Sequence, residues 1–236
     1  MDELTRLANR FGSDKGSRGP SAHLYTRIYH DLFGHMRGAR IRLLELGLLH
    51  IADPAWDDPA KRNAGGAVGR RAPSLQMWSH YFPKGEIFGF DINDFSAVRL
   101  PRCRILRGDV GDRADLARLA VESGGGFDII IDDASHASHH QQIALGALFP
   151  ALRDGGLYAI EDLRFQPEDL EIAGAARTLD MLRRAEVTGA FGSDYLTPAE
   201  ADRLSRGVAR VMMFDDLGTA HSLRRRDALA VLVKRR

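Results

Sequence analysis

The sequence has 236 residues, with 33 basic and 32 acidic side chains and a formal net charge of +1. This length suits one α/β domain, residues 1–236, and the balanced charge gives no electrostatic case for binding nucleic acid or an anionic membrane. The single cysteine, Cys103, excludes an internal disulfide and a thiolate metal cage, which favours a reducing compartment. No apolar run approaches the roughly 18 residues of a membrane span, and the N-terminus has acids where a signal peptide needs basic and then apolar residues. We therefore expect a cytoplasmic protein without nucleic-acid or membrane partners.

The first 38 residues are expected to form a helical cap. Glu3 to Phe11 and Leu24 to Phe33 have the apolar spacing of helices, and a polar loop bounded by Gly12 and Gly16 separates them. The histidines of this region show no metal-ligand spacing, so we expect them to be surface or capping residues: His23, His30 and His35.

The next part of the chain alternates between strands and other elements. Ile41 to Leu46 is expected to be the first central strand, and the 48–73 segment after it is too long and irregular for a simple connector, which predicts a lid or a disordered loop. A helix should follow with Ser74 as its N-cap. Further strands are expected at Glu86 to Asp91 and Cys103 to Arg107.

Two buried strands are each followed by a pair of acids. Phe127 to Ile131 leads into Asp132 and Asp133, and Gly156 to Ile160 leads into Glu161 and Asp162. In a parallel sheet both pairs would lie at one edge, where four carboxylates repel each other unless a cation lies among them. A hard divalent cation such as Mg²⁺ or Mn²⁺ prefers such oxygen ligands.

A simpler alternative is that these acids only cap the following helices. Ser135 or Ser138 could share that role for a helix beginning near Ser138. The recurrence of the acid pair on two strands, and His136 three residues after Asp133, favour a functional site instead.

The C-terminal part is expected to close the sheet. After a helix-rich insertion, Ala209 to Phe214 and Ala228 to Val233 should pair antiparallel, because their connector is too short for a parallel crossover. Asp91, at the end of the second strand, suits a ribose because its oxygens can accept from both hydroxyls. The loop after the first strand lacks a Gly-x-Gly-x-x-Gly pattern, and no Walker lysine motif is present, which favours S-adenosylmethionine over NAD.

Seven motifs carry a resemblance to a known family. They are Gly12-Ser13-Asp14-Lys15, His23-Leu24-Tyr25-Thr26, Leu44-Glu45-Leu46-Gly47, Ser74-Leu75-Gln76-Met77-Trp78, Gly89-Phe90-Asp91-Ile92, Asp132-Asp133-Ala134-Ser135-His136 and Ile160-Glu161-Asp162-Leu163. Together they resemble the macrolide-sugar O-methyltransferases of the mycinamicin type. The resemblance implies a class I methyltransferase: a Rossmann-like parallel sheet closed by an antiparallel C-terminal hairpin, with helices on both faces.

The resemblance also implies roles for individual residues. Asp133, Glu161 and Asp162 would hold a magnesium ion that binds a sugar hydroxyl, and His136 would be the base, with His139 and His140 as alternatives. The implied cofactor-binding residues are Glu45, Gly47, Ser74, Asp91, Ile92, Asp109, Val110 and Asp132. The 48–73 and 163–207 segments would select the substrate.

We therefore expect an S-adenosylmethionine-dependent O-methyltransferase of antibiotic biosynthesis that acts on a sugar or a sugar-bearing natural product. Two other classes stay open at this point: a nicotinamide-dependent oxidoreductase on the same sheet, and a non-catalytic, cofactor-binding accessory protein. The sequence leaves the acceptor, the methylated position and a homo-oligomeric state undecided.

Overall fold

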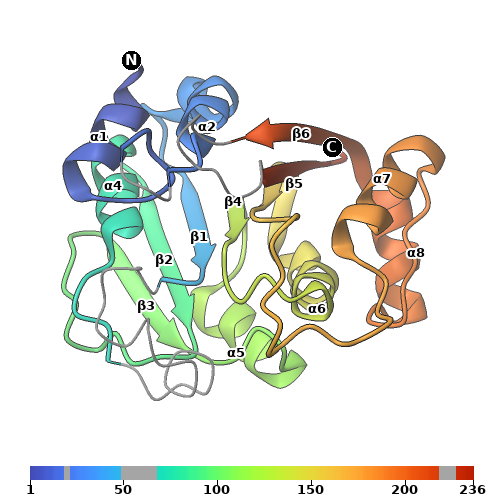
Figure 1. Ribbon diagram of the computed structural model, residues 1–236. Coiled ribbons are helices and arrows are strands. Elements are labelled where there is room, and N and C mark those ends of the chain that lie inside the picture. Colours follow the sequence, from blue (N-terminus) through green and yellow to red (C-terminus); the bar gives the residue numbers. More distant parts are fainter. Residues whose placement is uncertain (19–21, 49–67, 218–226) are drawn as a thin grey trace.

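Seven strands form one sheet in the order β3-β2-β1-β4-β5-β7-β6 (Figure 1). The computed structural model describes residues 1–18, 22–48, 68–217 and 227–236. Within these residues the strands are β1 (Arg42–Leu46), β2 (Glu86–Asp91), β3 (Cys103–Arg107), β4 (Phe127–Asp132), β5 (Leu152–Ile160), β6 (Val208–Leu217) and β7 (Asp227–Lys234).

The strand directions create a switch point in the middle of the sheet. Strands β1 to β5 are parallel, and β7 pairs antiparallel with both β5 and β6. The chain runs outward from β1 through β2 to β3, and then returns to β4 on the other side of β1. Ligands of open α/β sheets bind at the carboxyl ends of strands at such a point. The register places Leu46, Asp132 and Ile160 side by side, so the ends of β1, β4 and β5 are level.

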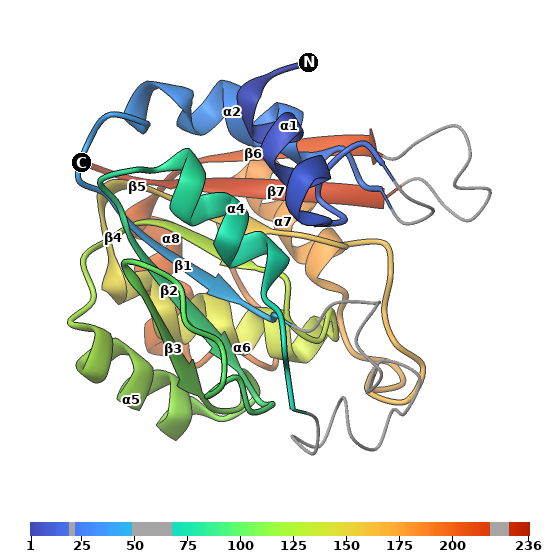
Figure 2. The ribbon, with the colours of Figure 1, turned by 90° about the vertical axis from the view of Figure 1, so that its left-hand side faces the viewer.

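Helices cover both faces of the sheet (Figure 2). Those on one face are α1 (Glu3–Phe11), α2 (Tyr25–Phe33) and α4 (Pro73–Tyr81). Those on the other face are α5 (Arg113–Ser123), α6 (Ser138–Leu148), α7 (Thr178–Thr188) and α8 (Pro198–Gly207). Two short 3-10 helices are η1 (Gly34–Met36) and η2 (Phe149–Ala151).

An aromatic core joins α2 and α4 to the sheet. The Tyr29 ring stacks on Phe33 at a centroid distance of 5.0 Å and meets Trp78 edge to face at 5.8 Å. All three side chains are fully buried. Packing of this kind fixes the angle at which α2 crosses the sheet, and it therefore fixes where the polar end of Tyr29 points.

The predicted sheet and its antiparallel closure are confirmed, with two corrections. Strand β5 begins at Leu152, earlier than the Gly156 expected from the sequence. Ser74 is not an N-cap: α4 begins at Pro73, and Ala72 is the capping residue. Proline suits the first helical turn because its φ is already helical and it has no N–H to leave unpaired.

The helical cap and the two insertions predicted from the sequence are described only in part. Helices α1 and α2 lie where the sequence places them, and α7 and α8 lie within the 163–207 segment. Most of the 48–73 segment lies outside the described residues, so its role stays a prediction, as does the organisation as one domain. Among the described residues, no helix combines the length and apolar composition needed to cross a membrane.

Candidate active site

The predicted acids meet at the carboxyl edge of β4 and β5, beside the turn that leaves β1. Gly47, in that turn, has a φ of 85°, and a Cβ at this position would lie 2.0 Å from the carbonyl oxygen of Asp133. Only glycine allows the turn after β1 and the turn after β4 to approach this closely. Gly47 therefore allows the end of β1 to lie against the acids. It acts through its backbone conformation and has no side chain to contact a ligand.

A buried lysine lies among three of the acids. Lys15, from the loop after α1, is 1% exposed. Its Nζ lies 2.7 Å from Glu161 Oε2 and 3.3 Å from Glu45 Oε1, and it also contacts Asp133 Oδ2. Burial lowers the pKa of Lys15, but the three carboxylates outweigh burial and hold this pKa well above its usual value. Lys15 therefore carries a positive charge that balances part of the acid cluster.

Helix α2 contributes two tyrosines to the same cluster. Tyr29 OH donates to Glu161 Oε1 at 2.7 Å, and Tyr25 OH accepts from the backbone N–H of Asp162 at 3.3 Å. Both carboxylate oxygens of Glu161 therefore have a partner, Tyr29 on one side and Lys15 on the other. Burial, followed by the charge of Asp133, raises the pKa of Glu161 well above its usual range.

A second set of side chains gathers on the other side of Asp133. Ligand atoms of Asp133, His136 and Asp162 lie within 4.8 Å of one another. Burial lowers the pKa of His136 even though Asp133 acts in the opposite direction, so the imidazole is neutral at neutral pH. Its Nδ1 is buried with no hydrogen-bond partner in the described parts of the chain. A neutral imidazole can accept a proton or bind a cation.

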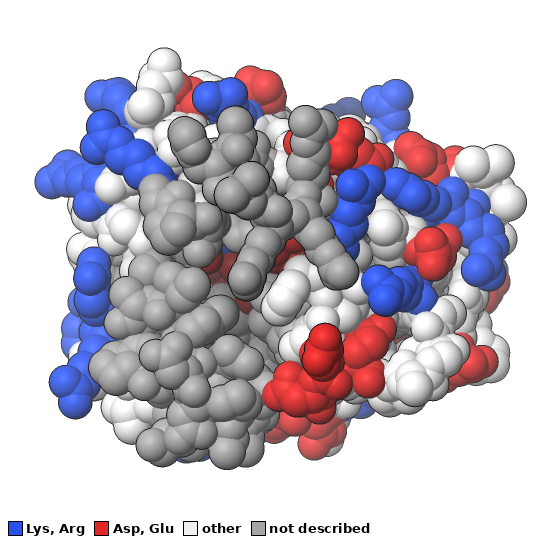
Figure 3. Space-filling model, in the orientation of Figure 1, with Lys and Arg blue, Asp and Glu red and all other residues white. Residues whose placement is uncertain are grey.

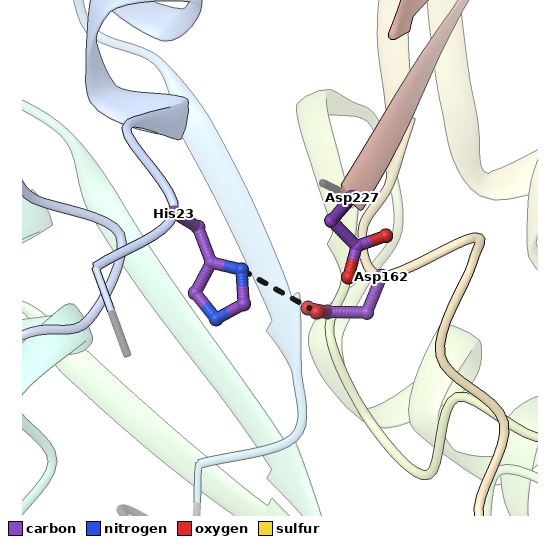
Figure 4. Close-up of side chains that lie close together, drawn as sticks. All are labelled: His23, Asp162 and Asp227. Atoms are coloured by element: carbon purple, nitrogen blue, oxygen red, sulfur yellow. Dashed lines mark ion pairs between the residues drawn. The ribbon is translucent and has the colours of Figure 1, made fainter. Parts of the chain in front are cut away.

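Asp162 also belongs to a group that the sequence did not predict (Figure 4). His23 Nδ1, from the loop before α2, lies 3.5 Å from Asp162 Oδ1, and Asp227, at the start of β7, completes the group within 4.8 Å. Burial, Asp133 and Asp227 together raise the pKa of Asp162 well above its usual range. His23, expected to be a surface or capping residue, is 26% exposed and in addition lies beside Asp162.

These oxygens fit a hard divalent cation. Asp133 and Asp162 offer carboxylate oxygens beside His136, and Glu161 keeps further lone pairs next to its two hydrogen bonds. Oxygen-rich sites without soft ligands suit Mg²⁺ or Mn²⁺. Of the predicted ligands, Asp133 and Asp162 are brought together with His136, whereas Glu161 faces Lys15 and Tyr29.

The alternative bases lie elsewhere. His140 Nδ1 is 2.8 Å from Ser135 Oγ, and a Cβ added to Gly111 would lie 2.6 Å from His140 Nε2. His139 lies beside Tyr195, with ring centroids 5.6 Å apart. Neither histidine belongs to the acid groups found among the described residues.

The capping alternative does not describe the helix after these acids. The N-cap of α6 is Ala137, which makes no side-chain cap hydrogen bond. The backbone N–H of Ser138 is instead satisfied by Glu171 Oε2 at 2.8 Å, from the loop after β5. Asp133 is thus left for another role.

Most of the predicted cofactor residues lie at or just after the ends of β1, β2, β3 and β4, and Ser74 lies in α4. Asp91 Oδ2 accepts from the Leu48 N–H at 2.7 Å, and Asp91 Oδ1 accepts from the Asn93 N–H at 2.7 Å. Asp109 Oδ1 accepts from Gly111 N–H at 2.7 Å. Asn93 Nδ2 also donates to Asp91 Oδ1, at 3.0 Å, and these bonds together orient the Asp91 and Asp109 carboxylates.

The other predicted cofactor residues are buried or half-buried around these acids: Glu45, Ser74, Ile92, Val110 and Asp132. Burial raises the pKa of Glu45 and of Asp132, in each case to about 7. Asp132 Oδ2 has no hydrogen-bond partner in the described part of the structure. A buried acceptor of this kind can take a hydrogen bond from a ligand.

Comparisons with known proteins agree with this arrangement. No family model matches the chain. It is 41% identical over 161 residues to the Streptomyces olivaceus 8-demethyl-8-(2-methoxy-alpha-L-rhamnosyl)-tetracenomycin-C 3'-O-methyltransferase. The matched region covers 68% of this chain and 37% of the relative. The chain is 38% identical to the Micromonospora griseorubida mycinamicin VI 2''-O-methyltransferase, over 68% of this chain and 36% of the relative. The structure of the MycE methyltransferase from the mycinamycin biosynthetic pathway, in complex with Mg, SAH and mycinamycin VI, matches with a TM-score of 0.73 and 27% identity, over 100% of this chain and 55% of that chain.

The sheet, its antiparallel closure and this structural match define a class I methyltransferase fold, as the sequence predicted. The chain is a homologue of these sugar O-methyltransferases over about two thirds of its own length. It spans less than two fifths of the length of these curated relatives.

Proposed function

We propose that this chain is an S-adenosylmethionine-dependent, Mg²⁺-dependent O-methyltransferase that acts on a hydroxyl of a sugar or of a sugar-bearing natural product in antibiotic biosynthesis. The observation that carries the proposal is the convergence of Asp133, His136 and Asp162 within 4.8 Å at the switch point of the sheet. The homology to sugar O-methyltransferases supports the same conclusion.

In the proposed reaction His136 removes the proton from the sugar hydroxyl. A sugar hydroxyl is a poor nucleophile at neutral pH, and a divalent ion held by Asp133, Asp162 and Glu161 would lower its pKa. The lowered pKa of His136 keeps the imidazole neutral and able to accept this proton. Asp133 lies beside His136, and its charge stabilises the imidazolium that forms.

The cofactor would supply the methyl group as a sulfonium electrophile, so the remaining task of the chain is to position it. Asp91 would accept the ribose hydroxyls, because its carboxylate is oriented by two backbone N–H groups. Asp109 and Val110 would contact the adenine. Glu45, Gly47, Ser74, Ile92 and Asp132 would complete the cofactor site.

Calorimetry with S-adenosylhomocysteine, with and without Mg²⁺, tests the cofactor and the metal separately. Methyl transfer from labelled S-adenosylmethionine to methyl α-L-rhamnopyranoside tests the reaction, and we expect excess EDTA to abolish it and Mg²⁺ to restore it. Full activity in EDTA would disprove the metal dependence. Binding of NADH in place of S-adenosylhomocysteine would instead support an oxidoreductase, which the homology does not favour.

A small-molecule, glycosylated acceptor is part of this proposal. On the face drawn in Figure 3, basic and acidic side chains are interspersed, in keeping with the net charge of +1. The cytoplasmic location and a homo-oligomeric state stay predictions, as does the absence of nucleic-acid or membrane partners.

A further inference from the structure

Phe165 is an exposed aromatic side chain next to the proposed base. It is 51% exposed, and its ring meets the His136 ring at a centroid distance of 5.8 Å with 68° between the planes. Single exposed apolar residues are common on protein surfaces, so exposure alone would mean little. Phe165 is distinguished by its position, because its ring lies next to His136, which belongs to the group of Asp133, His136 and Asp162.

The chain at Phe165 and just before it is held in place by hydrogen bonds and an ion pair. The Phe165 N–H donates to the Asp162 carbonyl at 3.0 Å, which ties the ring to a proposed metal ligand by a tight turn. The Arg164 guanidinium pairs with Asp215 at 2.6 Å, and the Arg164 N–H donates to Asp227 Oδ1 at 3.1 Å. The phenyl ring is therefore presented by an ordered backbone, so little ordering entropy is lost when a ligand binds to it.

The chemistry of the acceptor explains why such a ring would stand there. If His136 takes a proton from a sugar hydroxyl, the ring carbons that carry the hydroxyl must lie close to the imidazole. A pyranose presents an apolar face of C–H groups, and stacking this face on a phenyl ring removes apolar surface of both from water.

We propose that Phe165 binds the apolar C–H face of the acceptor sugar and orients the sugar at His136. This inference rests on the proposed function. It makes Phe165 a substrate-binding residue whose contribution falls on substrate affinity rather than on proton transfer or cofactor binding.

Three variants test the inference: Phe165→Ala, Phe165→Trp, and Val187→Ala as a matched control. Val187 is also an exposed apolar residue, 85% exposed on α7. Initial rates are measured with S-adenosylmethionine, Mg²⁺ and either methyl α-L-rhamnopyranoside or its 4-nitrophenyl glycoside. Calorimetry with S-adenosylhomocysteine and the melting temperature of each variant complete the measurements.

We expect Phe165→Ala to raise KM for both glycosides by about five- to tenfold, the scale of one lost aromatic contact, with kcat within about threefold of the parent. Phe165→Trp should keep KM within about threefold of the parent, since the indole also offers an aromatic face. Val187→Ala should match the parent, and the affinity for S-adenosylhomocysteine should be unchanged in all three variants.

Three results would overturn the inference while leaving the proposed function intact. They are an unchanged KM in Phe165→Ala, a rise in KM for the 4-nitrophenyl glycoside alone, which would assign Phe165 to the aglycone, and a fall in kcat at constant KM. A parent protein that binds S-adenosylhomocysteine but neither binds nor methylates either glycoside would overturn the sugar acceptor and this inference together.

Discussion

The acid cluster has two sides with different surroundings. On the sealed side, which consists of Lys15, Tyr29, Glu45 and Glu161, the charged side chains are 1% exposed or less. On the open side, which consists of Asp133, His136 and Asp162, the side chains of Asp133 and Asp162 are 20% and 10% exposed, and His136 is half-buried. Asp133 contacts both sides, because it pairs with Lys15 and also lies beside His136.

This difference indicates a division of labour. A buried charge that loses its partner is costly, because no water replaces the partner. Substitutions on the sealed side should therefore lower stability first. A site that binds substrate must be reachable and must keep free ligand atoms, so substitutions on the open side should lower the rate first. Variants on each side test this division.

On the open side, His136→Ala should lower kcat by roughly 10²- to 10⁴-fold, the usual contribution of a general base. The affinities for Mg²⁺ and S-adenosylhomocysteine and the melting temperature should change little. Single-turnover rates measure the effect, and His139→Ala is the control. A stable His136→Ala variant that keeps more than a tenth of the activity would move the role to His139 or His140.

On the sealed side, Lys15→Met should lower the free energy of unfolding by about 3 to 5 kcal/mol, because three carboxylates lose their shared cation inside the protein. Urea unfolding without metal measures this loss. Lys84→Met is the control, since Lys84 is the exposed lysine that follows α4. A loss below about 1 kcal/mol, the scale of a surface ion pair, would show that the two sides do not differ as proposed.

The sequence predicted much of this arrangement because its signals are local. Buried strands followed by paired acids gave Asp132, Asp133, Glu161 and Asp162, and parallel pairing put them at one edge. The spacing of His136 from Asp133 predicted their proximity for the same reason. Strand direction alone carries these inferences, so no side-chain packing had to be known.

The sealed side could not be predicted in the same way, because its contacts join distant parts of the chain. Lys15 and Glu161 are 146 residues apart in sequence, and Tyr29 and Glu161 are 132 residues apart. Which residues meet depends on how α2 packs on the sheet. The apolar spacing of α2 would be the same if its tyrosines only packed in the core, so it does not predict their contacts with the acids. The motif Gly12-Ser13-Asp14-Lys15 indicated that Lys15 has a function, but no local sequence pattern showed which function.

Asp132 is a buried acid that does not contact Lys15, the cation of the sealed side. Burial raises its pKa to about 7, so the folded protein holds a proton that the unfolded chain releases near pH 4. Stability should therefore fall as the pH rises from about 4 to about 7, and the penalty should stay constant above pH 7. Asp132→Asn removes this penalty, and its stability relative to the parent should be higher at pH 8 than at pH 4 by about 4 kcal/mol, since each pKa unit is worth about 1.4 kcal/mol. Urea unfolding at both pH values measures the difference, and Asp154→Asn, at a carboxylate that is 74% exposed, is the control. Equal stability differences at the two pH values would contradict the raised pKa.

Asp91 lies outside both sides, and it tests whether the cofactor half is independent of the acid cluster. Its two oxygens already accept from the N–H groups of Leu48 and Asn93, so the carboxylate is fixed before a ligand binds. Asp91→Asn keeps the shape but replaces one accepting oxygen by a donor, which should weaken S-adenosylhomocysteine by roughly 1.5 to 3 kcal/mol. Mg²⁺ affinity should stay at the parent value, because Asp91 ends β2 while the acid cluster follows β4 and β5.

Calorimetry with each ligand measures both effects, and Asp94→Asn, on the same loop, is the matched control. If Asp91→Asn binds S-adenosylhomocysteine within twofold of the parent, the ribose site lies elsewhere. If the variant loses affinity for both S-adenosylhomocysteine and Mg²⁺, the cofactor half and the acid cluster are coupled through the turn at Gly47.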